Sequence, residues 1–203
     1  MIRVDRNDDV WTVTIDRADK ANALTEDMLK ELTDIAIAAR DIKVFILTGA
    51  GRVFSAGADL DQAAKGLAVS DQWETLSSAI AEIKGLSVAA LNGTVAGGAF
   101  GMVLACDVRV SVGAAKFFYP VMRLGFLPQP SDVRRMVEFV GPSRAKLILM
   151  GGQKILADEA LSIGLIDRII DDEDVLGAAM LLSQDAQLAK QSHVAAIKSM
   201  IQS

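Results

Sequence analysis

The sequence predicts an α/β fold in which strands and helices alternate, followed by a small helical C-terminal part. Short apolar runs of strand length occur at residues 44–48 and 88–91, and each ends at a glycine-containing turn. Apolar residues recur at helical spacing on either side of these runs. Such alternation is typical of crossover connections between parallel strands. The chain of 203 residues is long enough for one main body with a sizeable core.

The first half of the chain is predicted to hold two strands and two helices. Polar and apolar residues alternate over residues 10–15, which predicts the first strand. Thr25 precedes an amphipathic stretch that runs to about Arg40, and we expect it to cap that helix. The next strand leads to a loop of small residues at 54–60. A second helix is expected over residues 71–84, where the residues at helical spacing are Trp73, Leu76, Ile80 and Ile83.

The stretch at residues 88–107 combines a strand, a glycine turn and a helix. Its strand ends at an Asn-Gly turn, and Gly97 and Gly98 precede the apolar helix, with Gly101 one turn further on. The missing side chains allow a ligand to lie against the backbone. The start of the helix leaves N–H donors unpaired and carries a partial positive charge. This turn is therefore predicted to hold a developing anion.

The second half of the chain is richer in helices. Strands are predicted at residues 108–112 and 116–118. A Gly-Pro-Ser sequence at residues 141–143 is expected to separate two helices. The helices are predicted at residues 133–140, 144–150, 157–163 and 173–202. We accordingly divide the chain into an α/β core of residues 1–165 and a helical C-terminal segment of residues 166–203.

Composition argues against several classes of protein. The net charge of -5 and the pI near 4.9 provide no basic field for nucleic acid. No apolar run approaches the roughly 20 residues of a membrane span, and the N-terminus has no apolar segment of the signal-peptide type. A single cysteine, Cys106, which is interpreted as buried core, and a single histidine, His193, argue against a disulfide framework and a histidine-based metal cluster. A cytoplasmic protein without a metal is expected.

Six short motifs occur in a specific order and spacing, although each of them alone is weak. They lie at residues 20–24, 54–60, 92–98, 105–107, 125–128 and 157–165, and they read KANAL, FSAGADL, NGTVAGG, ACD, GFLP and ADEALSIGL. In this combination the chain resembles the crotonase superfamily, the enoyl-CoA hydratase/isomerase family. The match extends along nearly the whole sequence.

The resemblance implies a crotonase-like fold of repeated ββα units with a spiral core, and an acyl-CoA thioester as substrate. Two backbone N–H groups hold the thioester oxygen of an enolate in that family, and by position they correspond to Ala58 and Gly98. Coenzyme A would enter as part of the substrate, with no permanently bound cofactor. The positions that match CoA contacts in the family are Lys20, Asn22, Ala23, Leu24, Ala56, Gly57, Ala58, Asp59, Leu60 and Asp61.

The chain departs from the family pattern at the two glutamates with which the hydratases handle water and the proton. Gly101 and Val121 stand at those positions, and neither side chain can transfer a proton. Asp132 is the nearest candidate replacement, although a helix N-cap is the favoured interpretation of this residue. Tyr119 is a second candidate donor, for which a packed aromatic ring at a strand end is the favoured interpretation.

Three functions therefore remain open. The chain is interpreted first as an acyl-CoA enzyme that stabilises an enolate, and alternatively as a catalytically inactive acyl-CoA-binding protein or a CoA-ester decarboxylase or hydrolase. Neither the acyl group nor the reaction type follows from the sequence. The resemblance implies a homo-oligomer, a trimer in the family, although the helices that build the trimer are shortened here. Lys190 and Lys198 are available for the CoA phosphate, which a C-terminal lysine often meets in the family.

Overall fold

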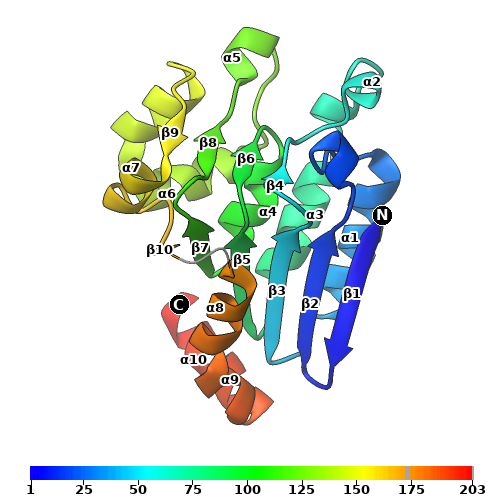
Figure 1. Ribbon diagram of the computed structural model, residues 1–203, viewed down its shortest axis with the longest axis vertical. Coiled ribbons are helices and arrows are strands. Elements are labelled where there is room, and N and C mark those ends of the chain that lie inside the picture. The colour runs from blue at the N-terminus through cyan, green and yellow to red at the C-terminus, as the bar shows by residue number, and fades with distance from the viewer. Residues whose placement is uncertain (172–173, 203) are drawn as a thin grey trace.

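The structure is a computed structural model that describes residues 1–171 and 174–202. A six-stranded sheet runs through the molecule in the order β1-β2-β3-β5-β7-β10 (Figure 1). The pair β1–β2 is antiparallel and the other neighbours are parallel. The strands of this sheet are β1 (Ile2–Asn7), β2 (Val10–Ile15), β3 (Val44–Gly49), β5 (Leu86–Leu91), β7 (Val108–Val112) and β10 (Arg168–Ile170).

A second sheet of four strands has the order β4-β6-β8-β9. Its strands are β4 (Val53–Ser55), β6 (Thr94–Ala96), β8 (Lys116–Phe118) and β9 (Ile155–Leu156). Three successive turns of the chain, β3–β4, β5–β6 and β7–β8, each give one strand to each sheet and then pass into helices. This arrangement confirms the predicted α/β fold of repeated ββα units.

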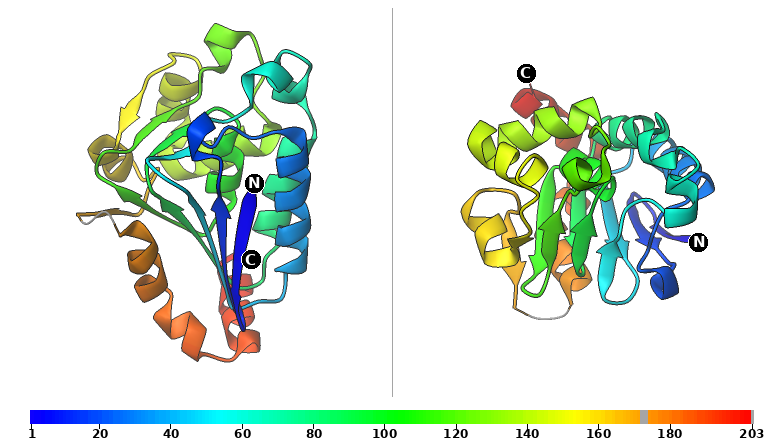
Figure 2. Two further views of the ribbon diagram at one scale, coloured as in Figure 1. Left: turned by 45° about the vertical axis from the view of Figure 1, so that its right-hand side comes forward. Right: turned by 90° about the horizontal axis from the view of Figure 1, so that it is seen from above.

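Helices cover both faces of the six-stranded sheet (Figure 2). The strand β3 is buried along its whole length, so its alternate residues belong to two different clusters. Phe45 and Leu47 pack in the cluster that contains residues of α1 (Glu26–Ala38), α3 (Gln72–Ala81) and α4 (Ala99–Ala105). Val44 and Ile46 pack in the cluster of α8 (Val175–Leu182) on the other face. Burial on both faces explains why β3 reads as a continuous apolar run.

The ends of several helices follow the predicted signals. The Thr25 side chain accepts a hydrogen bond from the Met28 N–H at 3.3 Å and caps α1 as expected. Gly141, with φ 78° and ψ 163°, interrupts α6 (Pro130–Leu149) where the Gly-Pro-Ser sequence was expected to separate two helices. The other helices are η1 (Ala18–Lys20), α2 (Leu60–Ala63), η2 (Leu67–Val69), α5 (Val121–Leu124), α7 (Ala157–Ser162), α9 (Gln184–Leu188) and α10 (Gln191–Gln202).

The structure corrects the prediction at the C-terminus. The single helix expected over residues 173–202 is three helices, α8 to α10, and its predicted first residue, Glu173, lies outside the described residues. Asp174 caps α8, because its side chain accepts a hydrogen bond from the Gly177 N–H at 2.8 Å. Strand β10 pairs with β7 in parallel, so the main sheet continues beyond residue 165. The division of the chain at that residue stays a prediction.

Several elements were not predicted, among them β1, β6, β10 and α5. Strand β1 lies at the sheet edge and is largely exposed, so its sequence IRVDRN lacks the apolar pattern of a buried strand. The other three have only three or four residues each, too few for a period to be recognised. Among the described residues, no helix combines the length and the apolar character needed to cross a membrane.

Candidate functional site

Three loops meet at one edge of the four-stranded sheet. They follow the carboxyl ends of β4, β6 and β8, which are parallel neighbours and therefore end on the same side. Ligands of α/β proteins commonly bind outside the carboxyl ends of parallel strands. The first loop carries Ala58, the second carries Gly98 and the third carries Tyr119. The fold thus brings together three residues that lie far apart in the sequence.

The loops of Ala58 and Gly98 are in direct contact. Gly57 has φ +87°, and a side chain on it would lie 2.7 Å from the carbonyl oxygen of Ala96. Only glycine fits at this position, because the backbones of the two loops approach too closely for a Cβ. Leu24 fixes the first loop further, since its N–H donates to Gly57 at 2.7 Å and its carbonyl accepts from Asp59 at 2.8 Å.

The backbone N–H groups of Ala58 and Gly98 are unused by the protein itself. Within the described residues, neither group donates to a backbone or side-chain acceptor. Gly98 is the residue that precedes α4, with φ −59° and ψ −16°. Backbone donors are rarely left unpaired without a reason. The two N–H groups are therefore not occupied by acceptors in the described residues, and their role as donors to a ligand oxygen stays a prediction.

Both donor residues line one cavity of about 250 Å³. Most of its lining is apolar, and the exposed side chains of Leu60, Leu124 and Leu127 belong to it. The further lining residues include Ala56, Ala63, Ala68, Trp73, Phe118, Tyr119, Val121, Arg123, Phe126 and Gln129. A largely apolar pocket with a few polar groups is typical of a small-molecule site.

The Trp73 side chain lines this cavity next to Gly98. A Cβ on Gly98 would lie 2.9 Å from the Trp73 indole. The indole N–H donates to the carbonyl of Leu67 at 2.8 Å, which fixes the ring. In the sequence, Trp73 belongs only to the apolar pattern of a helix. Its burial agrees with that pattern. The pattern does not indicate that the ring lines the cavity.

Tyr119 and Asp132 form a buried pair next to the cavity. The Tyr119 hydroxyl donates to Asp132 Oδ2 at 2.8 Å, and the phenol ring stacks on Phe100 with centroids 5.4 Å apart. Tyr119 lines the cavity, whereas Asp132 lies behind it. The expected packed aromatic ring is thus present, and its hydroxyl is in addition bonded to the carboxyl group that the sequence singled out.

The interpretation of Asp132 as a helix N-cap is wrong. Helix α6 begins earlier, with Gln129 as its N-cap and Pro130 as its first residue, so Asp132 lies inside the first turn. The side chain makes no capping bond, and Oδ1 is the one buried side-chain oxygen or nitrogen in the described residues without a hydrogen-bond partner. Proline is favoured at the first helical position, which explains the earlier start.

The carboxyl group of Asp132 occupies the space that Gly101 leaves open. A Cβ on Gly101 would lie 2.8 Å from Asp132 Oδ1. Burial raises the pKa of Asp132 to about 6, although the hydrogen bond from Tyr119 and the charge of Arg135 oppose this effect. Burial and the nearby Asp132 also raise the pKa of Tyr119. Perturbed pairs of this kind occur preferentially at functional sites.

A second polar cluster supports the start of α6 from the side of α3. The Ser131 hydroxyl donates to Glu74 at 2.8 Å and accepts from Arg135 at 3.1 Å. The Ser77 hydroxyl lies 3.2 Å from that of Ser131. These contacts tie α3 to α6 and hold the turn that carries Asp132 in place.

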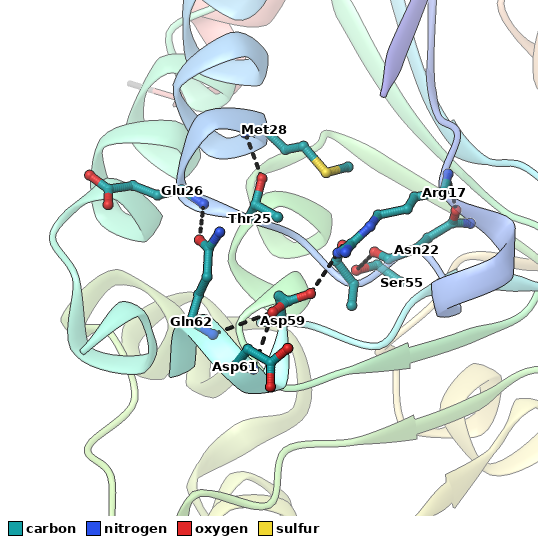
Figure 3. Close-up of polar contacts among 10 residues, drawn as sticks. Arg17, Asn22, Thr25, Glu26, Met28, Ser55, Asp59, Asp61 and Gln62 are labelled. Atoms are coloured by element: carbon teal, nitrogen blue, oxygen red, sulfur yellow. Dashed lines mark hydrogen bonds and ion pairs between the residues drawn. The ribbon is translucent and has the colours of Figure 1, made fainter. Parts of the chain in front are cut away.

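Several residues expected to contact CoA have side chains that shape the first loop (Figure 3). Asn22 is completely buried, and its side-chain amide donates to the carbonyls of Ala50 and Val53 at 2.9 and 2.7 Å. Leu24 is also completely buried. Lys20 is exposed, and Ala23 is partly exposed. Asn22 and Leu24 thus offer a ligand no side-chain surface.

Asp59 likewise has partners within the protein. It pairs with Arg17 at 2.7 Å and accepts the N–H groups of Asp61 and Gln62 at the start of α2 (Figure 3). The Arg17 hydrogen bond holds the pKa of Asp59 below its usual range. Leu60 and Asp61 are exposed beside the loop. Ala56, Ala58 and Leu60 are the members of this predicted group that line the cavity.

Neither of the two lysines available for the CoA phosphate, Lys190 and Lys198, lines this cavity. Lys198 donates to Asp107 at 2.7 Å and to the Gly85 carbonyl at 3.0 Å. It lines a different cavity of about 970 Å³ between α10 and the core. Lys190 is exposed in the turn before α10. Among the described residues, Arg123 is the cationic side chain that lines the cavity of Ala58 and Gly98, and no sequence motif indicated this role.

Cys106 has the buried environment expected of it, and His193 lies at the surface. Cys106 is buried, and burial raises the pKa of its thiol to about 12. His193 is exposed on α10. No group of three or more histidine, cysteine, aspartate or glutamate side chains in the described part of the chain is arranged to hold a metal ion.

Comparisons with known proteins agree with this fold. A family model described as enoyl-CoA hydratase/isomerase matches residues 5–203. The carnitinyl-CoA dehydratase of Escherichia coli K12 is 32% identical over 205 residues, which cover 97% of this chain and 78% of that protein. Among solved structures, Pseudomonas aeruginosa DspI has a TM-score of 0.90 and 29% identity, and the match covers 99% of this chain and 86% of DspI. Enoyl-CoA hydratase from Bacillus anthracis has a TM-score of 0.90 at 26% identity, with 99% and 82% covered.

Proposed function

Because the chain belongs to the enoyl-CoA hydratase/isomerase family, we propose that it binds an acyl-CoA thioester and stabilises the enolate through Ala58 and Gly98. One observation carries this proposal. Two backbone N–H groups without internal acceptors among the described residues lie on contacting loops at one cavity. Donors fixed in advance where negative charge develops stabilise the transition state more than the ground state.

The cavity suits the apolar parts of such a substrate. Leu60, Leu124 and Leu127 are large apolar side chains that remain exposed around it. Apolar contacts of this kind favour an acyl chain or the pantetheine arm, while Arg123 can meet an anionic group at the same cavity. Lys20, with Ala23 nearby in the sequence, remains a proposed contact for the nucleotide because it is exposed. Coenzyme A enters as part of the substrate in this proposal.

Decarboxylation of a malonyl-type CoA ester is the second candidate reaction. Gly101 and Val121 carry no ionisable group, and loss of CO2 generates an enolate without a base on the protein. Thioester hydrolysis is a related reaction that the same site could support. The dehydratase relative instead suggests elimination of water from a hydroxyacyl-CoA. A panel of crotonyl-CoA, a 3-enoyl-CoA, a hydroxyacyl-CoA and methylmalonyl-CoA distinguishes these reactions.

Replacing Gly98 by proline tests the donor role directly. The φ angle of −59° suits proline, which lacks the N–H group. The loss of one such donor typically costs about 3 kcal/mol, so turnover of the best substrate should fall roughly 100-fold. The matched control is Gly98→Ala, which keeps the N–H and places a Cβ against the same face of Trp73.

The two variants separate loss of the donor from crowding by the new side chain. The alanine variant should retain more of the activity than the proline variant, and both should still bind acetyl-CoA in calorimetry. Equal activity in the two variants would show that the Gly98 N–H is not a donor in the reaction. Binding of acetyl-CoA without turnover of any panel member would instead identify a non-catalytic acyl-CoA-binding protein.

Homo-oligomeric assembly is a further part of the proposal. Large apolar side chains remain exposed on the last three helices, notably Leu181, Leu188 and Ile201. Exposed apolar surface of this kind commonly marks an interaction surface. A second copy of the chain is the partner that the family resemblance implies.

A further inference from the structure

We propose that Tyr119 and Asp132 form the proton relay of this site. Tyr119 exchanges a proton with the α-carbon of the acyl group, and Asp132 exchanges the phenol proton of Tyr119. The inference rests on the proposed enolate chemistry, for which it supplies the missing acid and base. The carboxyl group of this relay comes from α6 and extends into the space left by Gly101, one of the two positions at which the family resemblance places glutamates. Tyr119 is the catalytic residue in this scheme, and Asp132 acts through it.

The first support is the position of the phenol. Tyr119 follows β8 and lines the same cavity as Ala58 and Gly98, so this residue borders the site in which the enolate would form. Its proton points away from the cavity, because the hydroxyl donates to Asp132 Oδ2 at 2.8 Å. The phenol oxygen keeps acceptor capacity beside this bond, and in the proposed relay it accepts a proton on the side of the cavity.

The second support is the otherwise unexplained burial of a carboxyl group. Asp132 is 1% exposed, and its Oδ1 atom has no partner among the described residues. An unpaired buried oxygen of this kind is unfavourable, and a purely structural position would more readily hold an apolar side chain. Gly101 leaves the space into which Oδ1 extends. The Asp132 carboxyl group thus extends from α6 to α4, the helix that follows Gly98.

The surroundings of Asp132 suit a group that changes protonation near neutral pH. The charged and titratable groups that face it are Tyr119 after β8, Glu74 on α3 and Arg135 on α6. Desolvation and Glu74 favour the neutral acid, whereas the Tyr119 hydrogen bond and Arg135 favour the carboxylate. Their balance keeps the pKa at about 6, and an acid or base is most effective with a pKa near the working pH.

The relay balances its atoms and electrons as follows. The Cα–H bond of the acyl group breaks, and its proton forms a new O–H bond with the phenol oxygen of Tyr119. At the same time the original phenol proton passes to Asp132 Oδ2, which becomes a carboxylic acid. The electron pair of the Cα–H bond forms the enolate, whose oxygen accepts the N–H groups of Ala58 and Gly98. The reverse sequence returns a proton to the α-carbon.

Hydrogen–deuterium exchange at the α-carbon of butyryl-CoA tests the relay whatever acyl group the natural substrate carries. Butyryl-CoA has α-hydrogens and no leaving group, and incorporation of deuterium from D2O is read by mass spectrometry. The wild-type protein should catalyse exchange, with a rate that rises with pH to a plateau above about pH 6 as Asp132 ionises. Tyr119→Phe and Asp132→Asn should each lower the rate by about 100-fold or more.

Calorimetry with acetyl-CoA supplies the control, because both variants should bind with a Kd close to that of the wild type. In Asp132→Asn, the residual exchange should lose the inflection near pH 6, which a merely structural effect would not remove. Exchange that survives in both variants within a few fold would overturn the relay and leave the donor pair intact. No exchange by the wild-type protein would overturn the enolate chemistry itself.

Discussion

The carboxyl group of Asp132 has a thermodynamic effect that depends on pH. Its pKa is about 6 in the folded protein and near 3.8 in an exposed carboxyl group. The folded state therefore binds more protons than the unfolded state between these values. The resulting contribution to stability is fully present below about pH 4 and is lost as the pH rises through 6. At neutral pH the burial of this carboxylate destabilises the fold.

Asp132→Asn should consequently stabilise the protein at neutral and alkaline pH. The gain in the free energy of unfolding should approach about 3 kcal/mol above pH 7 and vanish towards pH 4. Urea unfolding of both proteins at pH 4.5 and pH 8 measures this difference. Asp61→Asn, at an exposed position, serves as the control. The reverse change Asn22→Asp would not serve, because the Asn22 side chain is buried and its hydrogen bonds are satisfied. An equal difference at both pH values would contradict a raised pKa.

Residue identities alone predicted part of this site. The glycine turn before α4 was singled out from its residues, whereas Ala58 and Gly98 were assigned as donors by position from the family resemblance, and Asp132 because it is the nearest carboxyl group to a missing one. The hydrogen bond between Tyr119 and Asp132 could not be found in this way, since it depends on how β8 and α6 pack. The true start of α6 was signalled by Pro130, which favours the first position of a helix.

Helices α4 and α6 share one carboxyl-sized space between Gly101 and Asp132. A side chain on Gly101 begins 2.8 Å from Asp132 Oδ1, so only one of the two helices can supply an acidic group there. Overpacking of a buried site typically costs about 1–3 kcal/mol, and a second carboxylate adds repulsion. The carboxyl group is on α6, while α4 contributes the space.

Gly101→Glu should therefore destabilise the protein by at least about 3 kcal/mol at neutral pH. The double variant Gly101→Glu with Asp132→Gly should recover most of this loss, apart from about 1 kcal/mol for glycine inside a helix. Thermal unfolding of the two variants measures the recovery. If the single variant proved as stable as the wild type, the two helices would not compete for the same space.

Most elements were predicted well where the apolar pattern was long and lay on one face of the element, or where the element was buried on both faces. The strands β2 and β7 have the predicted bounds, and α1 and α3 lie within the predicted stretches. The strand β8 also has the predicted bounds, although it has only three residues. The strand β6 was missed because its three residues lie between two glycine-rich turns. The break between α8 and α9 was missed because Ser183 and the residues around it carry no glycine or proline. Tertiary packing decides such boundaries, and a single sequence does not encode it visibly.

Over the whole molecule, exposed apolar side chains and the larger cavity are associated with the C-terminal helices. Leu181 on α8 and Leu188 on α9 are 70% and 79% exposed, and the cavity of about 970 Å³ lies between α10 and the core. A self-associating protein would cover at least part of this surface. The arrangement agrees with the proposed homo-oligomer.

Light scattering in solution should accordingly give a mass that is a multiple of the 21.6 kDa chain. Leu188→Glu should shift the distribution towards the monomer, because a buried carboxylate without a partner opposes association. Leu147→Glu, at a half-exposed position on α6, is the matched control and should leave the mass unchanged. A monomeric wild-type protein at micromolar concentration would contradict the proposal.

The alternation of strands between the two sheets has a consequence for how this protein becomes functional during synthesis. The Ala58, Gly98 and Tyr119 loops come from three successive ββα turns, and Asp132 follows the third. Each parallel pairing closes a long stretch of chain, which makes such topologies slow to form. A nascent chain that has not yet exposed Asp132 can hold the donor pair but no proton relay. In the proposed mechanism, oxyanion binding and proton transfer would thus be acquired separately, in the order in which the ribosome releases the residues for each.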